Sequence, residues 1–213
     1  MKRFGGFALV VVIALGLATL PAMADTAFSD LGNPVNYNCC FGWTVGGQNS
    51  LVGLVEDANQ FTSAVSGTVN QIDLGLGWVL GTNGATIQLW TSVNNLPGTL
   101  LGTGTVTGLP TFGTTSSQLV TASGNFGNIT AGQQYFVVVL AESDEWAAWN
   151  VNNQNVNGLL LQNTGNGWNS FPGETLGAFD VLTGGQGQVP EPASLMLLGS
   201  GLLAFASKLR RKK

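Results

Sequence analysis

The basic residues of this chain are confined to its two ends. All seven Lys and Arg lie within residues 2–3 or residues 208–213, and the sequence contains no His. Ten of the eleven Asp and Glu lie between residues 25 and 189, which gives that region a formal side-chain charge of −10. The chain therefore divides into two small basic ends and one acidic central region.

The lack of cations in the central region excludes several classes of function. A surface without Lys or Arg cannot neutralise phosphates, so no nucleic-acid partner is expected. Without His or Lys, the chain lacks the parts for triad catalysis, Schiff-base chemistry and His-ligated metal sites. Disorder is also disfavoured, because 44% of the residues are hydrophobic and six are Trp. We predict an ordered domain that is not an enzyme.

Residues 1–24 have the three parts of a secretory signal peptide. Lys2 and Arg3 supply positive charge, residues 7–20 are apolar, and Ala22 and Ala24 supply the small residues of a cleavage site. The apolar stretch is shorter than the roughly 20 residues that a permanent membrane span needs. We expect the secretion machinery and signal peptidase to act here, leaving Asp25 as the mature N-terminus.

Residues 190–213 read as a C-terminal membrane anchor. Pro190 and Pro192 prevent a helix from extending backwards, and residues 195–207 favour an apolar helix. Terminal cations suit both a helix C-terminus and a cytoplasmic membrane face. The cations that would orient the helix are Lys208, Arg210, Arg211, Lys212 and Lys213. The predicted single transmembrane helix, marginal in length, would hold the exported chain in the inner membrane at first.

This C-terminal segment resembles the PEP-CTERM sorting signal of Gram-negative bacteria. The resemblance rests on Pro190, Glu191 and Pro192, the apolar helix and the basic tail, in that order at the end of the chain. It implies recognition and processing by an exosortase, and a final location at the cell surface or in the extracellular matrix. It also implies an association with extracellular polysaccharide and biofilm.

The region 25–182 is expected to be one all-β domain, a single antiparallel β-sandwich, followed by a Gly- and Gln-rich linker at 183–189. Short apolar runs alternate with turn residues, as is typical of sandwiches. Residues 72–80 alternate as one half-buried strand. Asn83-Gly84 is expected to form a hairpin turn before a strand at 85–93, and residues 96–98 a turn before the next strand.

Further along, residues 134–141 are nearly all apolar, which predicts a central strand covered on both faces. Other expected strands lie at 146–151, 159–162 and 178–182. The domain also resembles the jelly-roll-like ectodomains called choice-of-anchor domains, whose similar pieces are residues 60–62, 88–90 with 96–101, 129–139, 145–149 and 167–168. That resemblance implies a surface domain of unknown activity and transfers no catalytic residue.

Cys39 and Cys40 are adjacent in an exported chain with no third cysteine. They can form a disulfide with each other, pair between molecules, or remain as free thiols. We favour the local disulfide. A metal site would need more ligands than these two residues supply.

The densest acidic cluster is Glu142, Asp144 and Glu145. It has three interpretations: a solvated loop, a calcium site built from hard oxygen ligands, or a carboxylate pair for glycoside hydrolysis. We prefer the solvated loop. Calcium is the one cofactor that the composition leaves open, and nothing in the sequence places two carboxylates across a sugar.

Aromatic residues favour a carbohydrate-binding, lectin-like module as the alternative function. Trp90 shares a strand face with Gln88, while Trp146 and Trp149 would lie on opposite faces of their strand. Trp90, Trp146 and Trp149 are the candidates for stacking on sugars. An ice-binding surface, for which three alternating threonines at 103–107 would be a start, is the weaker possibility because Thr is ordinary in strands.

Overall fold

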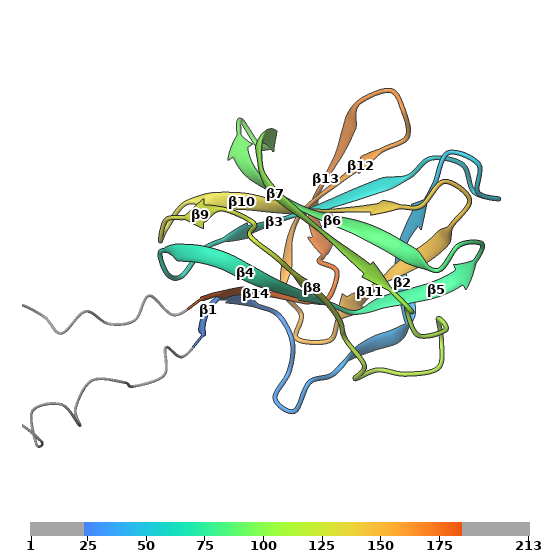
Figure 1. Cartoon of the computed structure of the whole chain (residues 1–213), viewed down its shortest axis with the longest axis horizontal. Coiled ribbons are helices and arrows are strands. Elements are labelled where there is room, and N and C mark those ends of the chain that lie inside the picture. The colour runs from blue at the N-terminus through green and yellow to red at the C-terminus, as the bar shows by residue number, and fades with distance from the viewer. Residues whose placement is uncertain (1–23, 185–213) are drawn as a thin grey trace, which may run out of the picture. The chain divides into compact units, whose positions relative to one another are not determined.

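The structure, a computed structural model, describes residues 24–184. Those residues form one compact unit, Ala24–Gly184, built from strands without any helix in the described range (Figure 1). Its strands are β1 (Asp25–Ser29), β2 (Tyr37–Gly46), β3 (Glu56–Thr62), β4 (Gly67–Leu74), β5 (Leu76–Leu80), β6 (Gly84–Val93), β7 (Leu96–Thr107), β8 (Val120–Ser123), β9 (Asn128–Ile129), β10 (Gln134–Ala141), β11 (Trp146–Asn152), β12 (Asn157–Asn163), β13 (Trp168–Thr175) and β14 (Phe179–Thr183).

The strands form two layers, which confirms the predicted all-β sandwich. One layer is a six-stranded sheet in the order β13-β12-β3-β10-β6-β7. The other layer contains a five-stranded sheet, β1-β14-β4-β8 with β9 beside β4, and a three-stranded sheet, β2-β11-β5. All strand pairs are antiparallel. The main core, to which all three sheets contribute, lies between the layers.

The central strand predicted at residues 134–141 is confirmed as β10. It pairs with β3 on one side and β6 on the other. Val137 and Val139 face the main core, while Phe136 and Val138 belong to a second, smaller cluster on the outer face of the sheet. All four side chains are at most 2% exposed. Burial on both faces explains why this segment reads as a continuous apolar run.

The single strand predicted at residues 72–80 is wrong, because the chain leaves one sheet and enters another at Gly75. β4 belongs to the five-stranded sheet and β5 to the three-stranded sheet. The Gly75 N–H donates to the Ala178 carbonyl, and the Gly75 carbonyl accepts from the Asn150 N–H. A Cβ at this position would lie 3.2 Å from the Tyr37 ring. Gly75 thus lets the two sheets of one layer meet at a tight seam.

The turns predicted at Asn83-Gly84 and at residues 96–98 also differ from the structure. β5 and β6 lie in different sheets, so the residues around Asn83 cross between layers instead of closing a hairpin. Asn83 holds this crossing in place through two side-chain hydrogen bonds to the backbone of Leu109. The real hairpin turn joins β6 to β7 at Asn94 and Asn95, whose φ angles are 53° and 62°. Asn tolerates this left-handed region better than most residues.

Both ends of the described domain lie side by side in one sheet. Asp25 on β1 pairs with Thr183 on β14, and β14 pairs with β4 on its other side. Thr183 lies within the segment that we expected to be a linker, so the strand runs one residue further than predicted. The rest of that linker, residues 185–189, falls outside the described residues.

Candidate functional site

The acidic loop after β10 is held to the neighbouring β5–β6 connection by its own carboxylates. Glu145 is fully buried, and its two carboxylate oxygens accept the N–H groups of Gly84 at 3.3 Å and Glu142 at 3.2 Å. Asp144 accepts the Thr82 N–H at 3.2 Å. These hydrogen bonds brace the loop, and of its three carboxylates only Glu142 and Asp144 are exposed.

These contacts give the loop carboxyls opposite pKa shifts. Burial raises the pKa of Glu145 to about 7, although its backbone hydrogen bonds oppose the change. The Thr82 hydrogen bonds lower the pKa of Asp144. Within residues 24–184, no three acidic or Cys side chains are close enough to hold a metal ion. The structure thus does not bring Glu142, Asp144 and Glu145 together as calcium ligands, nor does it place two of them across a cleft.

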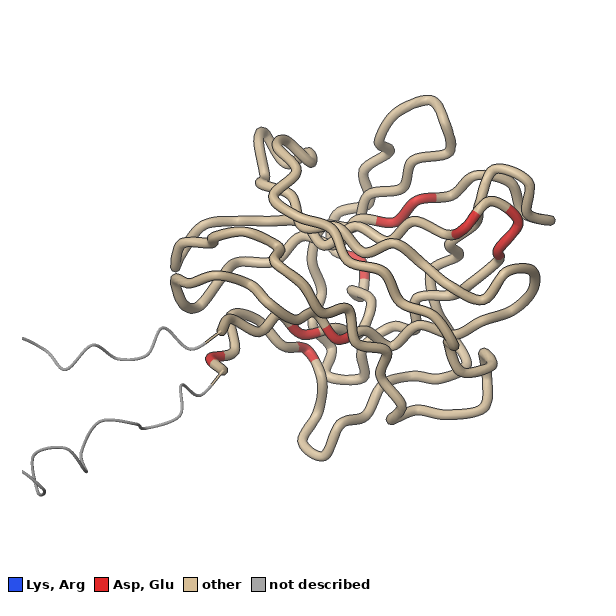
Figure 2. The backbone as a smooth tube through the Cα atoms, in the orientation of Figure 1, with Lys and Arg blue, Asp and Glu red and all other residues tan. Residues whose placement is uncertain are grey.

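A second group of carboxyls, absent from the sequence predictions, lies in the five-stranded sheet and its entry. Asp180 on β14 is directly opposite Asp73 on β4, and Asp30 follows β1 nearby (Figure 2). Asp30 is 1% exposed and accepts the Phe179 N–H at 2.7 Å. Burial raises its pKa to about 8, and burial together with Asp73 raises the pKa of Asp180 to about 7. Figure 2 shows no Lys or Arg on the described domain that could offset these charges.

Asp57, on the core-facing side of β3, is as fully buried as Glu145. It is fully buried, and its Oδ1 accepts the Gln162 Nε2–H at 2.9 Å. Its Oδ2 has no hydrogen-bond partner among the described residues. Burial raises the pKa of Asp57 to about 8. The only sign of this burial in the sequence is that Asp57 alternates with Asn59 and Phe61, which also face the core.

The three candidate tryptophans have different positions. Trp149 is fully buried at the seam between the two smaller sheets, where its Nε1–H donates to the Ala178 carbonyl at 3.1 Å. Its burial contradicts a role in stacking on sugars, because no face of the ring reaches solvent. Trp146 is half-buried on β11, on the opposite strand face as expected. Trp149 is therefore part of the core, and its ring packs between the two smaller sheets.

Trp90 is half-buried on the outer face of the six-stranded sheet, as its shared face with Gln88 predicted. Its Nε1–H donates to the Gln88 Oε1 at 2.9 Å, and its ring packs on the outer-face cluster. Trp168 on β13 packs on the same cluster from the other side. The sequence placed Trp168 in a piece of the choice-of-anchor resemblance but not among the candidates for sugar stacking, since its position opposite Asn163 follows from strand pairing alone.

A pocket of about 420 Å³ is lined in part by the segment that precedes β2. Its lining carries no charged side chain and no titratable group among the described residues. The lining residues are Gly32, Asn33, Pro34, Val35, Asn36, Ser116, Ser117 and Gln154. Amide and hydroxyl groups without a nucleophile–base pair suit binding better than catalysis.

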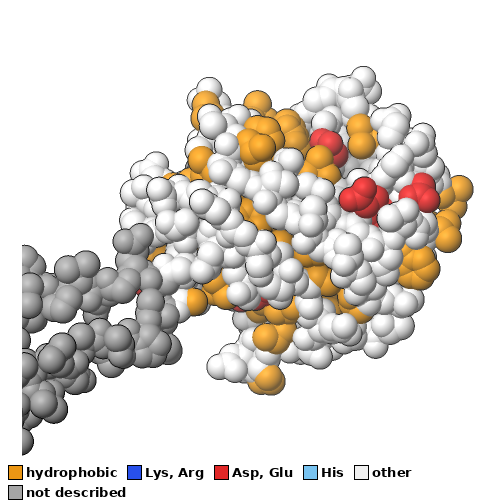
Figure 3. Space-filling view, viewed as in Figure 1, with side chains coloured by type: hydrophobic (Ala, Val, Ile, Leu, Met, Phe, Trp, Pro, Cys, Tyr) orange, Lys and Arg blue, Asp and Glu red, His pale blue; other side chains and the backbone are white. Residues whose placement is uncertain are grey.

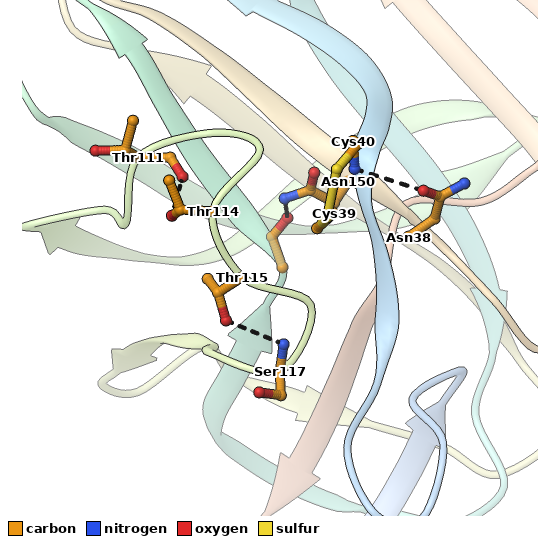
Figure 4. Close-up of a disulfide and its surroundings, with 9 residues drawn as sticks. Asn38, Cys39, Cys40, Thr111, Thr114, Thr115, Ser117 and Asn150 are labelled. Carbon is orange, nitrogen blue, oxygen red and sulfur yellow. Dashed lines mark hydrogen bonds between the residues drawn. A yellow bond between two sulfur atoms is a disulfide. The ribbon is translucent and has the colours of Figure 1, made fainter.

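Cys39 and Cys40 are joined by a disulfide in β2, with no free cysteine among the described residues. Figure 4 shows the bridge beside Asn150, near the loop that contains Thr111 and Ser117. The Cys40 N–H approaches the Asn38 Oδ1 at 3.4 Å. The local pairing is thus the one that the structure contains.

The targeting segments lie outside the described residues. These are the signal peptide apart from Ala24, the Pro190–Pro192 motif, the predicted C-terminal helix and the basic tail. Within residues 24–184, no helix is long and apolar enough to span a membrane. The described part ends at Gly184, directly after β14.

Comparison with known proteins identifies the C-terminal segment. Residues 188–212 match the PEP-CTERM protein-sorting motif. No curated protein matches the chain. The match covers the Pro-Glu-Pro tripeptide and most of the basic tail, so the chain carries the sorting signal that its sequence predicted. The signal is that of an exosortase substrate exported to the cell envelope or surface.

Proposed function

We propose that this chain is a non-enzymatic, exported surface protein, in which the β-sandwich has a structural or interaction role. The observation that carries the proposal is the sorting motif at residues 188–212, which begins within a few residues of the end of β14 at Thr183. Sorting places the domain, and the domain's surface determines what it does there.

The disposition of the carboxyls supports a role other than catalysis. Glu145 accepts two backbone N–H groups, and Asp57 and Asp30 are buried within the domain. A glycoside hydrolase needs two carboxyls facing one another across a sugar-binding cleft. The described pocket offers amides and hydroxyls in place of such a pair.

Charge supports an association with exopolysaccharide or biofilm material rather than with anionic polymers. The region between residues 25 and 189 has a formal charge of −10 and contains no Lys, Arg or His. Such a domain repels nucleic acids and acidic polymers, and it offers neutral glycans hydrogen-bonding amides without that penalty.

Replacing Pro190, Glu191 and Pro192 together by Ala tests the sorting role. In a host that has an exosortase, we expect the variant to remain unprocessed in the inner-membrane fraction, whereas the natural chain is processed and reaches the surface. Intact mass and fractionation measure both outcomes. Gln186→Ala, a change outside the motif match, is the matched control. Unchanged processing and location in the triple variant would overturn the proposal.

A further inference from the structure

The outer face of the six-stranded sheet carries an apolar strip that no second sheet covers. Ala58, Phe136, Val138 and Leu161, from three adjacent strands, form the strip and are at most 2% exposed. Their cover is provided by Trp90 and Trp168 together with Leu140 and Leu159. Figure 3 shows hydrophobic side chains gathered between the β6–β7 and β12–β13 hairpins. We call this surface the outer face.

Two indole rings lie at opposite sides of the outer face. Trp90 is directly opposite Phe136, and Trp168 is directly opposite Asn163. Trp168 on β13 and Trp90 on β6 are separated by β12, β3 and β10. Strand spacings of about 4.8 Å therefore place the two strands that carry them about 19 Å apart. Both rings are half-buried, so each has one side packed on the strip and part of its surface in solvent.

Two amide side chains lie on the outer face in the neighbourhood of Trp90, because Gln88 is on the same strand and Gln60 is in the same cross-strand row as Phe136 and Trp90. Gln88 fixes the Trp90 ring through its Oε1, and Gln60 donates to the Ser92 Oγ at 2.9 Å. Among the described residues, the Gln88 amide nitrogen and the Gln60 amide oxygen have no further side-chain partner. A small number of polar groups beside an aromatic surface can fix the orientation of a ligand through hydrogen bonds to its hydroxyls.

The outer face is nearly uncharged. Glu56 is the one carboxylate that the strands place on this face, and it accepts the Asn163 Nδ2–H at 2.8 Å. No Lys, Arg or His lies between residues 4 and 207, so the face offers nothing to an anionic ligand. An elongated ligand with apolar ring faces, hydroxyl edges and no charge matches these features.

We propose that the outer face binds an uncharged polysaccharide, with Trp90 and Trp168 stacking on separate sugar rings of one chain. A pyranose presents C–H groups on its face, which suit an indole, and hydroxyls at its edge, which suit Gln60 and Gln88. The span between the two rings requires a polymer several units long, so a monosaccharide reaches only one of them. The inference rests on the proposed role at the surface, and it names the ligand class.

Affinity electrophoresis of the full-length chain in nonionic detergent tests the proposal. The gels contain dextran, galactomannan, xyloglucan or, as the anionic comparison, alginate. We expect at least one neutral polymer to retard the protein and alginate to have no effect. Trp90→Ala and Trp168→Ala should each weaken the retardation about tenfold or more, in line with the strength of ring stacking on an aromatic. Trp78→Ala, a half-buried Trp on β5 of the three-stranded sheet, is the matched control.

A footprint on the natural protein covers the case in which a variant does not fold. Oxidation by N-bromosuccinimide, read by peptide mass spectrometry, should be slowed at Trp90 and Trp168 by the bound polymer, and unchanged at Trp78. The proposal is overturned if no neutral polymer binds, or if binding protects neither ring. It is also overturned if sedimentation shows a dimer and dimer formation alone protects both rings from oxidation. Because the Pro190–Pro192 variant keeps the outer face, its glycan binding separates a failure of this inference from a failure of sorting.

Discussion

Asp57→Asn is expected to flatten the pH dependence of the domain's free energy of unfolding. The carboxyl is fully buried, its pKa is raised to about 8, and its ordinary value is 3.8. Between these two values the folded chain keeps a proton that the unfolded chain releases. Rising pH therefore favours the unfolded state, and the stability that is fully present below about pH 4 is lost up to about pH 8.

The magnitude follows from one proton. A single differentially bound proton changes the unfolding free energy by about 1.4 kcal/mol per pH unit. Asn is nearly isosteric and keeps an oxygen that can accept the Gln162 hydrogen bond, but it cannot ionise. The stability of Asp57→Asn relative to the natural chain should therefore rise by about 4 kcal/mol between about pH 4.5 and about pH 7.5.

Urea unfolding of the full-length chain, followed by Trp fluorescence, measures this difference. All six Trp lie between residues 43 and 168, so the signal reports on the described domain alone. Glu174→Gln, which removes one exposed carboxylate on β13, is the control for loss of a charge. If the natural and Asp57→Asn curves of free energy against pH run parallel, then the folded and unfolded states ionise residue 57 alike, and the reasoning from burial fails.

Two further predictions concern packing and the disulfide. Gly177→Ala should destabilise the domain by about 2 kcal/mol in the same urea assay, because an added Cβ would lie 2.5 Å from the buried Trp149 ring. Gly124→Ala, whose added Cβ would lie 3.8 Å from its nearest neighbour, should stay within about 0.5 kcal/mol, and equal effects of the two changes would contradict the assignment. Reduction of the Cys39–Cys40 disulfide should shift the melting temperature by less than about 2 °C, since neighbouring residues close no chain loop in the unfolded state. A larger shift on adding a phosphine reductant would show that the bridge organises β2.

The fold class was predictable because the pattern of apolar and polar residues in each strand indicates which of its faces are buried. Residues 134–141 are apolar at every position between the two ends of the run. Such a run is expected of a strand that is covered on both faces. The sorting motif was predictable for a different reason: its recognition depends on a short contiguous sequence and not on the fold.

The error at residues 72–80 has a physical cause. Ile72, Leu74 and Leu76 are all fully buried in the same core, so the alternation continues across Gly75 although the strand does not. Periodicity reports which side of the chain is buried, and it cannot report which sheet provides the hydrogen bonds. Trp168 was missed for the same reason, because its contribution to the outer face depends on which strand lies beside β13.

The pairing of the two ends of the domain has a mechanical consequence. A pull on the C-terminal segment enters the domain at Thr183, at the end of a strand that is hydrogen-bonded to β1 on one side and to β4 on the other. A load along β14 therefore acts on both ladders in shear, so that several hydrogen bonds must break together. A domain attached in this way can transmit tension between its attachment and a ligand on the outer face without first peeling open.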